Sequence, residues 1–545
     1  MPTIMKPHTK HFSILLGLLA MAALAFTSCL DEDPRDRIDE DEAFDTPTNL
    51  YLNTVANLYS YIGGNSDSQG LQGTSRGVYD LNTFTTDEAI IPTRGGDWYD
   101  GGLWQALYTH DFNVGPVGDT WNHLYKVIVK CNKAINRLDA YANQFDERTL
   151  KAWEAEVRAL RAMYYCYLLD LYGSVPYVRT ATTELSAAEQ VSRSTLFNNI
   201  WEELSNALPY LADERSNTEG DYYGRMTQHV AWFILAKMAL NAEIWLDDDW
   251  TDDIRLDGKD ITLICEDEPL NAWEACMYWC DKLTAAGYQL ESNYTANFAV
   301  NNENSKENIF TIPMDKNLYS NIFINLFRSR HYNHGGAYGM ASENGTSATL
   351  RTVRTYGYNT KNEDKRFRYN FYADTVYVND VMVTLDTKEP LVYHPLTMAL
   401  DLTGEPYEKT AGARMKKYEV DRTAYSDGQL QNNDIVLFRY ADVLLMKSEA
   451  KVRNGDNGDK EMNMVRARVG MPNRKATLST LLDERLMELM WEGWRRQDLI
   501  RFDRFHRSYD IRQQRPDEAD RHTIVFPIPG GALSLNMKLK QNPGY

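Results

Sequence analysis

A loop at residues 91–102 places two aromatic side chains, Trp98 and Tyr99, beside Arg94 and Asp100 and between two pairs of glycines. Glycine pairs allow backbone angles that other residues avoid, and a Trp in such a loop is hard to bury completely. Aromatic faces next to bidentate donors and acceptors suit a ligand that is flat on one side and carries many hydroxyl groups. The four side chains therefore form the first candidate binding site, with interior packing of Trp98 as the equal alternative.

Two further groups of side chains could contact such a ligand. Tyr319, Tyr332 and Asn344 belong to a stretch rich in aromatics and amides at residues 317–344, and Asn65 and Asp67 lie in a glycine-led loop. Taken singly, each of these residues is more often a packing or solvent-exposed residue than a ligand contact. They are the second and third candidate groups.

No motif in the sequence predicts catalysis. Residues 73–77, Gly-Thr-Ser-Arg-Gly, match the spacing of a nucleophile elbow but lack the strand and helix which that motif requires. Neither a Walker A sequence nor a Gly-x-Gly-x-x-Gly sequence is present. Spacing alone cannot test for a glycosidase pair, because 77 acidic residues offer very many pairs. We expect a protein that is not an enzyme.

Metal ligands are also sparse. His331 and His334 have no third ligand nearby, and no Cys-x-x-Cys pair exists, so no metal site is predicted. The acidic residues 247–260 resemble a calcium loop in part, but Ile264 stands where the bidentate Glu is required. No cofactor is expected, and weak calcium binding stays an open alternative.

The N-terminus predicts export and lipid attachment. Residues 1–28 combine two Lys with an apolar run and no acidic residue, which is typical of a secretory signal peptide. Cys29 follows the apolar run, and acidic residues come directly after it. Such a Cys looks like the lipidated first residue of a bacterial lipoprotein, although Phe26 stands where Leu is usual.

The net charge of −19, from 77 acidic and 58 basic residues among 545, argues against nucleic acid as a partner. Hydrophobic residues make up 43% and charged residues 25%, as in an ordinary globular protein.

Apolar residues at spacings of three and four predict a mainly α-helical fold, and the strongest pattern is at residues 153–172. Successive helices joined by short turns suggest tetratricopeptide-like helix pairs. Residues 291–430 instead predict a long loop-rich region with a few short strands, which points to a functional surface. The predicted helices cover residues 121–138, 153–172, 196–208, 227–246, 272–285, 437–453 and 483–501.

Several segments, in order along nearly the whole chain, resemble one family, the SusD/RagB glycan-binding outer-membrane lipoproteins of Bacteroidetes. They are Glu156-Val-Arg-Ala-Leu-Arg161 with Gly173 and Pro176, Leu437-Phe-Arg439-Tyr-Ala-Asp442, Glu492-Gly-Trp-Arg495-Arg-Gln-Asp498, and the ending Phe526-Pro-Ile-Pro529 with Gln541-Asn-Pro-Gly-Tyr545. Charged residues on these apolar helices are expected to pair with neighbouring helices rather than with ligand, because an unpaired interior charge is costly. The five concerned are Arg161, Glu449, Glu492, Arg495 and Asp498.

The resemblance implies a SusD-like fold in which residues 29–545 form one domain after the signal peptide. Its parts are an N-terminal helical and binding-loop part (29–290), a loop-rich ligand-facing insertion (291–430) and a C-terminal part (431–545). It also implies surface exposure on the outer membrane through a lipid on Cys29. There the protein would capture an oligosaccharide and pass it to a SusC-like TonB-dependent transporter. The alternatives are a peptide-binding, RagB-like member, a surface glycan hydrolase, and a structural lipoprotein without ligand.

Overall fold

The computed structural model describes residues 43–184, 186–252 and 254–545. The chain divides into two compact units, Met1–Asn53 and Thr54–Tyr545. In the first unit helix α3 (Pro47–Tyr51) begins after Thr46, whose hydroxyl accepts a hydrogen bond from the amide of Asn49 at 3.1 Å. The predicted signal peptide and Cys29 lie outside the described residues.

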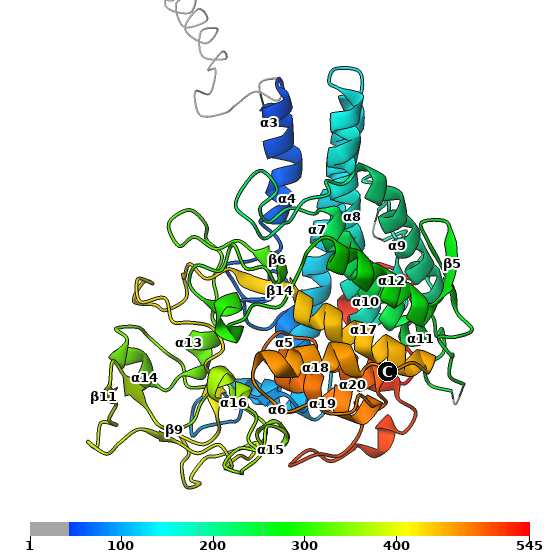
Figure 1. Ribbon diagram of the computed structural model, residues 1–545. Coiled ribbons are helices and arrows are strands. Elements are labelled where there is room, and N and C mark those ends of the chain that lie inside the picture. The colour runs from blue at the N-terminus through cyan, green and yellow to red at the C-terminus, as the bar shows by residue number, and fades with distance from the viewer. Residues whose placement is uncertain (1–42, 185, 253) are drawn as a thin grey trace, which may run out of the picture. The chain divides into compact units, whose positions relative to one another are not determined.

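Long helices form the first half of the second unit (Figure 1). Helix α7 packs on α8, α8 on α9, and α10 on α12, so that neighbours along the chain are also neighbours in space. This arrangement agrees with the predicted helix pairs, and the mainly helical fold is confirmed. The long helices are α7 (Gly115–Ala140), α8 (Glu147–Tyr172), α9 (Arg193–Ala207), α10 (Gln228–Leu240) and α12 (Ala272–Ala285).

Helix α8 shows why these segments are helical. Asp146 caps its start by accepting the amide of Thr149 at 2.9 Å, and Gly173 ends it with a φ of 72°. Leu160 and Leu168, on the predicted apolar face, are fully buried. Burial of this face against α7 and α9 stabilises the helix more than intrinsic propensity does.

The C-terminal helices differ from the prediction in two places. Residues 435–439 form strand β14 (Ile435–Arg439), so helix α17 (Tyr440–Asn454) begins after it rather than at Leu437. The single helix predicted at 483–501 is two helices, α19 (Leu478–Leu489) and α20 (Arg495–Arg501). Helices α18 (Asp459–Arg468) and α21 (Gly530–Leu535) complete this part.

The break between α19 and α20 has a tertiary cause. Trp491 and Gly493 have φ values of 69° and 75°, outside the helical region. The amide of Trp491 donates to the buried carboxylate of Glu88 at 2.5 Å, and its indole donates to the carbonyl of Asn370 at 3.1 Å. These bonds hold the chain out of helical geometry, although its sequence has helical periodicity.

Strands are short and form two-stranded antiparallel sheets. The longest pair joins β6 (Asn308–Ile312) to β14, which links the loop-rich region to α17. The other pairs are β1 (Ala89–Ile90) with β7 (Ser347–Ala348), β2 (Val175–Pro176) with β3 (Gln190–Val191), β4 (Thr262–Cys265) with β5 (Glu268–Asn271), β8 (Phe371–Tyr372) with β13 (Arg414–Met415), β9 (Asp374–Thr375) with β12 (Val392–Tyr393), and β10 (Tyr377–Val378) with β11 (Val381–Met382).

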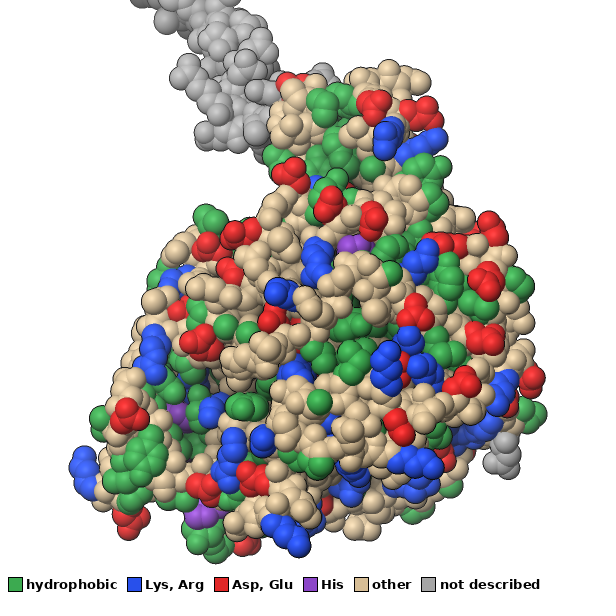
Figure 2. Space-filling view, viewed as in Figure 1, with side chains coloured by type: hydrophobic (Ala, Val, Ile, Leu, Met, Phe, Trp, Pro, Cys, Tyr) green, Lys and Arg blue, Asp and Glu red, His purple; other side chains and the backbone are tan. Residues whose placement is uncertain are grey.

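The loop-rich region also contains short helices and a small core of its own. Val376, Val378, Leu391 and Tyr393 are buried together beneath the loops. Figure 2 shows apolar side chains at the outer end of this region, and Tyr377, Val381 and Met382 are exposed on the β10–β11 hairpin. The short helices of the second unit are α4 (Asn57–Tyr59), α5 (Val78–Thr83), α6 (Leu103–Tyr108), α11 (Ala242–Trp245), α13 (Asn325–Ser329), α14 (Tyr332–Ala337), α15 (Leu350–Thr355) and α16 (Arg366–Asn370).

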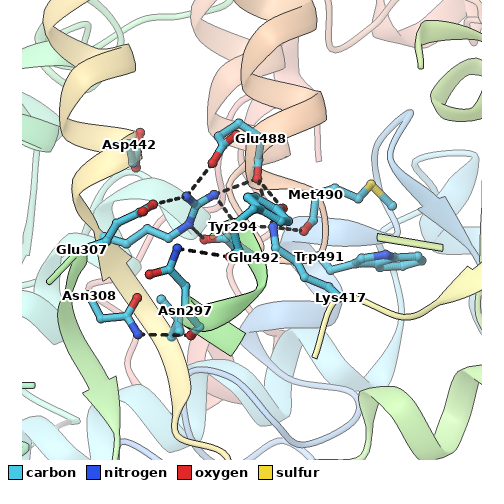
Figure 3. A network of polar contacts seen from close by, with 12 residues as sticks. Tyr294, Asn297, Glu307, Asn308, Lys417, Asp442, Glu488, Met490, Trp491 and Glu492 are labelled. Atoms are coloured by element: carbon cyan, nitrogen blue, oxygen red, sulfur yellow. Dashed lines mark hydrogen bonds and ion pairs between the residues drawn. The ribbon is translucent and has the colours of Figure 1, made fainter. Parts of the chain in front are cut away.

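A buried ionic network joins the loop-rich region to the C-terminal part of the second unit (Figure 3). The guanidinium of Arg439 pairs with Glu307 at 2.8 Å, Glu488 at 2.7 Å and Glu492 at 2.7 Å. Lys417 also donates to Glu492 at 2.5 Å. Charges withdrawn from water in this way persist only when each finds a partner.

The structural role expected for the five charged motif residues agrees with these and similar contacts. Arg161 pairs with Glu203, Glu449 with Arg501, Glu492 with Arg439, Arg495 with Asp87, and Asp498 with Arg485.

Within the described ranges, no helix combines the length and the apolar character that crossing a membrane would require.

Candidate functional site

A cavity of about 640 Å³ opens where the first candidate loop meets the loop-rich region. We call it the Trp98 cavity. Four of the nine predicted ligand residues line it, namely Asp67, Trp98, Asp100 and Tyr332. The other lining residues are Ser75, Arg76, Gly96, Asp97, Ile322, Ile324, Phe327, Ser342, Glu343 and Gln429.

The backbone of the first loop is held in unusual geometry. Trp98 and Asp100 have φ values of 63° and 44°, and Gly95, Gly101 and Gly102 also have positive φ. A bulky residue in the left-handed region costs about 1–3 kcal/mol, and such strain persists only where surrounding contacts enforce it. Here the hydrogen bond from the Trp98 indole to the Glu343 carbonyl is one of the contacts that hold this backbone and place the indole at the cavity.

Trp98 is partly packed and partly exposed. Its Nε1 donates to the carbonyl of Glu343 at 2.8 Å, and its ring lies 6.0 Å from that of Trp104, centroid to centroid. A Cβ added at Gly345 would come within 2.5 Å of the indole, so the ring lies directly on that backbone. Part of the indole remains open to the cavity, and both predicted roles of Trp98, packing and ligand contact, are compatible with this position.

Arg76 holds two carboxylates at one side of the cavity. One guanidinium nitrogen pairs with Asp100 at 2.9 Å and the other with Asp67. Burial opposes the charged form of Arg76, but Asp67 and Asp100 outweigh it and raise the pKa of the guanidinium. Asp100 also accepts the indole N–H of Trp104 at 2.7 Å, so its orientation is fixed from two sides.

Asp97 binds two further side chains at the cavity. It accepts the hydroxyl of Tyr332 at 2.6 Å and the ammonium of Lys409 at 2.8 Å. The hydrogen bonds from Lys409 and Tyr332 lower the pKa of Asp97 below its ordinary value. The Tyr332 ring, from the start of α14, is 42% exposed and so presents an aromatic surface.

Glu343 is the lining carboxylate without a hydrogen-bond or ion-pair partner for its side chain within the described part of the chain. Burial raises the pKa of Glu343, while Arg328 and Arg76 oppose that rise. Together with Asp67, Asp97 and Asp100 it makes the cavity rich in hydrogen-bond acceptors. An uncharged ligand with many hydroxyl donors fits such a lining better than an anion does.

Two of the predicted ligand residues are wrong because they are buried. Arg94 is 0% exposed, and its guanidinium donates to the carbonyls of Glu408 and Ala411, both at 2.9 Å. Asn344 is also 0% exposed and donates to the carbonyl of Lys409 at 3.0 Å. Both side chains join neighbouring loops beneath the site instead of facing a ligand.

The three remaining predicted residues lie outside the cavity lining. Tyr99 is 57% and Tyr319 46% exposed, and Asn65 makes a 3.4 Å hydrogen bond to Ser320. Their ligand role stays a prediction.

Sequence reasoning missed Arg76, Asp97 and Glu343. Arg76 stands within the Gly-x-Ser-x-Gly sequence at residues 73–77, whose spacing points to a hydrolase motif and not to a binding site. In the structure Ser75 of that sequence accepts a hydrogen bond from Arg328 at 3.1 Å. The signal that could identify Arg76 is its place as a charged residue between glycines in a segment without a strand pattern. No feature of the neighbouring sequence indicates that Glu343 lines a cavity.

The predicted histidine pair takes part in packing. His331 caps α14, and Nδ1 of His334 lies 3.0 Å from the Tyr393 hydroxyl. Burial lowers the pKa of His331 to about 4. Over residues 43–545, apart from Leu185 and Asp253, no three His, Cys, Asp or Glu side chains gather as a metal site would require.

Two family models match the chain. One, described as "SusD family", covers residues 280–545, and the other, "Starch-binding associating with outer membrane", covers residues 70–240. Each model covers less than half of the chain, and together they match parts of both helical regions and the loop-rich region, so the chain is similar to SusD proteins over most of its length.

Individual relatives cover nearly the whole chain at low identity. The starch-binding protein SusD of Bacteroides thetaiotaomicron is 22% identical over 98% of this chain and 100% of its own length. SusD-like protein P25 of Formosa agariphila is 22% identical over 98% of this chain and 99% of its own.

Solved structures confirm the fold. A SusD-like protein from Bacteroides fragilis matches with a TM-score of 0.69 at 18% identity, covering 93% of this chain and 99% of that chain. Surface glycan-binding protein A from Bacteroides thetaiotaomicron, solved in complex with laminarihexaose, matches with a TM-score of 0.66 at 19% identity. That match covers 92% of this chain and 100% of the other.

Proposed function

We propose that this protein binds an oligosaccharide in the Trp98 cavity and delivers it, chemically unchanged, to a TonB-dependent transporter of the outer membrane. One observation carries the proposal: an aromatic side chain and fixed carboxylates line the same cavity. The aromatic residue is Trp98, which has a positive φ, and the carboxylates are those of Asp67 and Asp100, which pair with Arg76. The names of the relatives, which include starch-binding and surface glycan-binding proteins, support it. Attachment to the outer surface through a lipid on Cys29 belongs to the same proposal.

Each part of the cavity has a distinct task in sugar binding. The open part of Trp98 offers an apolar surface to the C–H side of a sugar ring, and Tyr332 offers a second one. Asp67 and Asp100 accept hydroxyl hydrogens, and Arg76 can donate to a ring or hydroxyl oxygen. Because these groups already hold one another in place, little side-chain freedom is lost when the ligand binds.

The test is to replace Trp98 with Ala and to measure binding of laminarihexaose and maltoheptaose by calorimetry. We expect the affinity for whichever glycan the wild type binds to fall by about thirtyfold, which corresponds to about 2 kcal/mol for a central aromatic contact. Tyr210→Ala is the matched control, since that ring is 47% exposed, lies outside the cavity lining and is not a candidate ligand residue. Wild-type affinity in Trp98→Ala would contradict the site.

Two assays separate the alternatives. Reducing ends released from the bound glycan by purified protein would favour a surface hydrolase, and Glu343, whose pKa burial raises, would then be its first candidate acid. Binding of peptides but of no glycan in the panel would favour the RagB-like alternative.

A further inference from the structure

A second cavity, of about 570 Å³, shares no lining residue with the Trp98 cavity. It lies among α15, the start of α19, the end of α20 and the loop at residues 502–510. Seven arginines but only four aspartates line it, in a chain whose net charge is −19. We call it the arginine cavity; its arginines are Arg351, Arg354, Arg453, Arg495, Arg501, Arg504 and Arg507.

The inner arginines are already neutralised and belong to the scaffold. Arg495 donates to both carboxylate oxygens of Asp87, at 2.6 and 2.8 Å. Arg501 and Arg453 both pair with Glu449, at 2.6 and 2.8 Å. Because carboxylates pair with these three arginines, we do not count them as groups that could bind an added anion.

The outer arginines are different, because they have more positive charge than their neighbours can neutralise. Arg351 and Arg354 share Asp510, which bonds the amide of the former and lies 3.0 Å from the guanidinium of the latter. Asp483 adds only a contact of 3.5 Å to Arg351. Their side chains are 49% and 61% exposed.

Arg504 and Arg507 have no carboxylate partner within the described part of the chain. Arg504 donates only to the backbone carbonyl of Asp503, and the carboxylate of Asp503 lies 3.6 Å from Arg521 instead. Both arginines are exposed at the cavity. Two guanidinium groups three residues apart are therefore free to bind an anion.

Helix α19 adds to the positive potential at the same place. It has 12 residues, and its first residues, Leu478 and Ser479, line the cavity. Thr477 caps the amide of Thr480 but not those of Leu478 and Ser479. Free amides at a helix start carry partial positive charge, which strengthens an anion site formed by other groups. Leu482 and Phe502 supply an apolar wall.

We propose that the arginine cavity binds an oxyanion group, the carboxylate or sulfate of an acidic saccharide. A guanidinium donates two parallel hydrogen bonds that match both kinds of oxyanion, and it keeps its charge at any physiological pH. The cavity volume is within the range of small-ligand sites and admits a sugar ring beside the charged group. The site is separate from the Trp98 cavity, whose carboxylates disfavour anions.

The experiment uses the full-length mature protein and three probes at constant ionic strength, namely sodium sulfate, glucuronate and a trigalacturonate. The test variant is Arg504→Gln with Arg507→Gln, and the matched control is Arg148→Gln with Arg474→Gln, which removes the same charge from exposed positions elsewhere. We expect calorimetry to show binding of at least one probe by wild type and control, and an affinity at least tenfold lower in the test variant. All three proteins should melt at the same temperature, because the replaced side chains are exposed.

Equal affinity in the test and control variants, or no binding by the wild type, would overturn the proposal. Sulfate binding without saccharide binding would show an adventitious ion only and would also overturn it. Trp98→Ala should leave this binding unchanged, so failure at one cavity is distinguishable from failure at the other.

Discussion

Glu88 shows how a single residue can make stability depend on pH. Its side chain is 1% exposed and accepts the amide of Trp491 at the α19–α20 break. Burial raises the pKa of Glu88 to about 8, against the opposing effects of that amide and of Arg495. A carboxyl group whose pKa is higher in the folded than in the unfolded state stabilises the fold fully below the unfolded pKa. That stability is lost as pH rises through the folded pKa.

We therefore predict that the wild type loses about 2–4 kcal/mol of unfolding free energy between pH 5 and pH 8 relative to Glu88→Gln. The Gln side chain keeps an oxygen that can accept the Trp491 amide but does not titrate in this range. Urea unfolding of both proteins at several pH values measures the difference. If the unfolding free energies of the two proteins change in parallel with pH, the protonation state of Glu88 does not change on unfolding between pH 5 and pH 8, and the prediction is wrong.

The sequence suggests which types of side chain could contact a ligand, but it does not show which individual residues the fold brings to one cavity. Trp98, Asp67, Asp100 and Tyr332 line one cavity, and their contact with a ligand stays a prediction. Arg94 is as plausible as Arg76 from the sequence, since both are arginines in glycine-containing loops. Which one faces the cavity depends on contacts more than 300 residues away, such as the bond from Arg94 to the Glu408 carbonyl.

Helix α8 carries the clearest prediction at the element scale. Leu160 and Leu168 are 1% and 0% exposed, and the helix packs on both α7 and α9. Leu160→Ala or Leu168→Ala should lower the unfolding free energy by about 2–5 kcal/mol, because each leaves a cavity in a close-packed core. Chemical denaturation measures the loss, and Arg148→Ala, an exposed change in the first turn, is the control. A loss below about 0.5 kcal/mol would place this face in solvent.

The elements that periodicity predicted well are those whose hydrophobic face is continuous, as in α8. Hydrophobic periodicity predicted the wrong element where a local pattern competes with a contact to a residue far away in the sequence. Leu437 to Arg439 continue the apolar pattern of the predicted helix at 437–453, but the run Ile435–Arg439, rich in β-branched and aromatic residues, pairs with β6 instead. Likewise, the bond between Trp491 and Glu88 interrupts a helix across 403 residues of sequence. Neither β6 nor Glu88 is close enough in sequence to its partner for a local pattern to reveal the contact.

At the scale of the whole molecule, the Arg439 network connects β14, α19 and the loop-rich region (Figure 3). Arg439→Met should destabilise the protein by about 3–5 kcal/mol, because Glu307, Glu488 and Glu492 would each lose a partner while buried. Arg368→Met is the control, since that side chain is 50% exposed and its ion pairs are worth about 1 kcal/mol or less. Thermal and urea melts of both variants compare the two. Equal losses would mean that the buried network adds nothing beyond surface pairing.

The proposed membrane attachment also concerns the whole molecule, and it depends on Cys29, which is outside the described ranges. The apolar run ends at Ser28, directly before Cys29, and acidic residues follow. If signal peptidase cuts there, Cys29 becomes the N-terminal residue and carries lipid. We predict that cells fed a fatty-acid analogue label the wild type and Cys166→Ala but not Cys29→Ala. The compact unit Thr54–Tyr545 has its own buried core, so purified Cys29→Ala should melt like the wild type and bind the same glycan. Labelling of Cys29→Ala at the wild-type level would contradict lipid attachment at this residue and, with it, the proposed route to the cell surface.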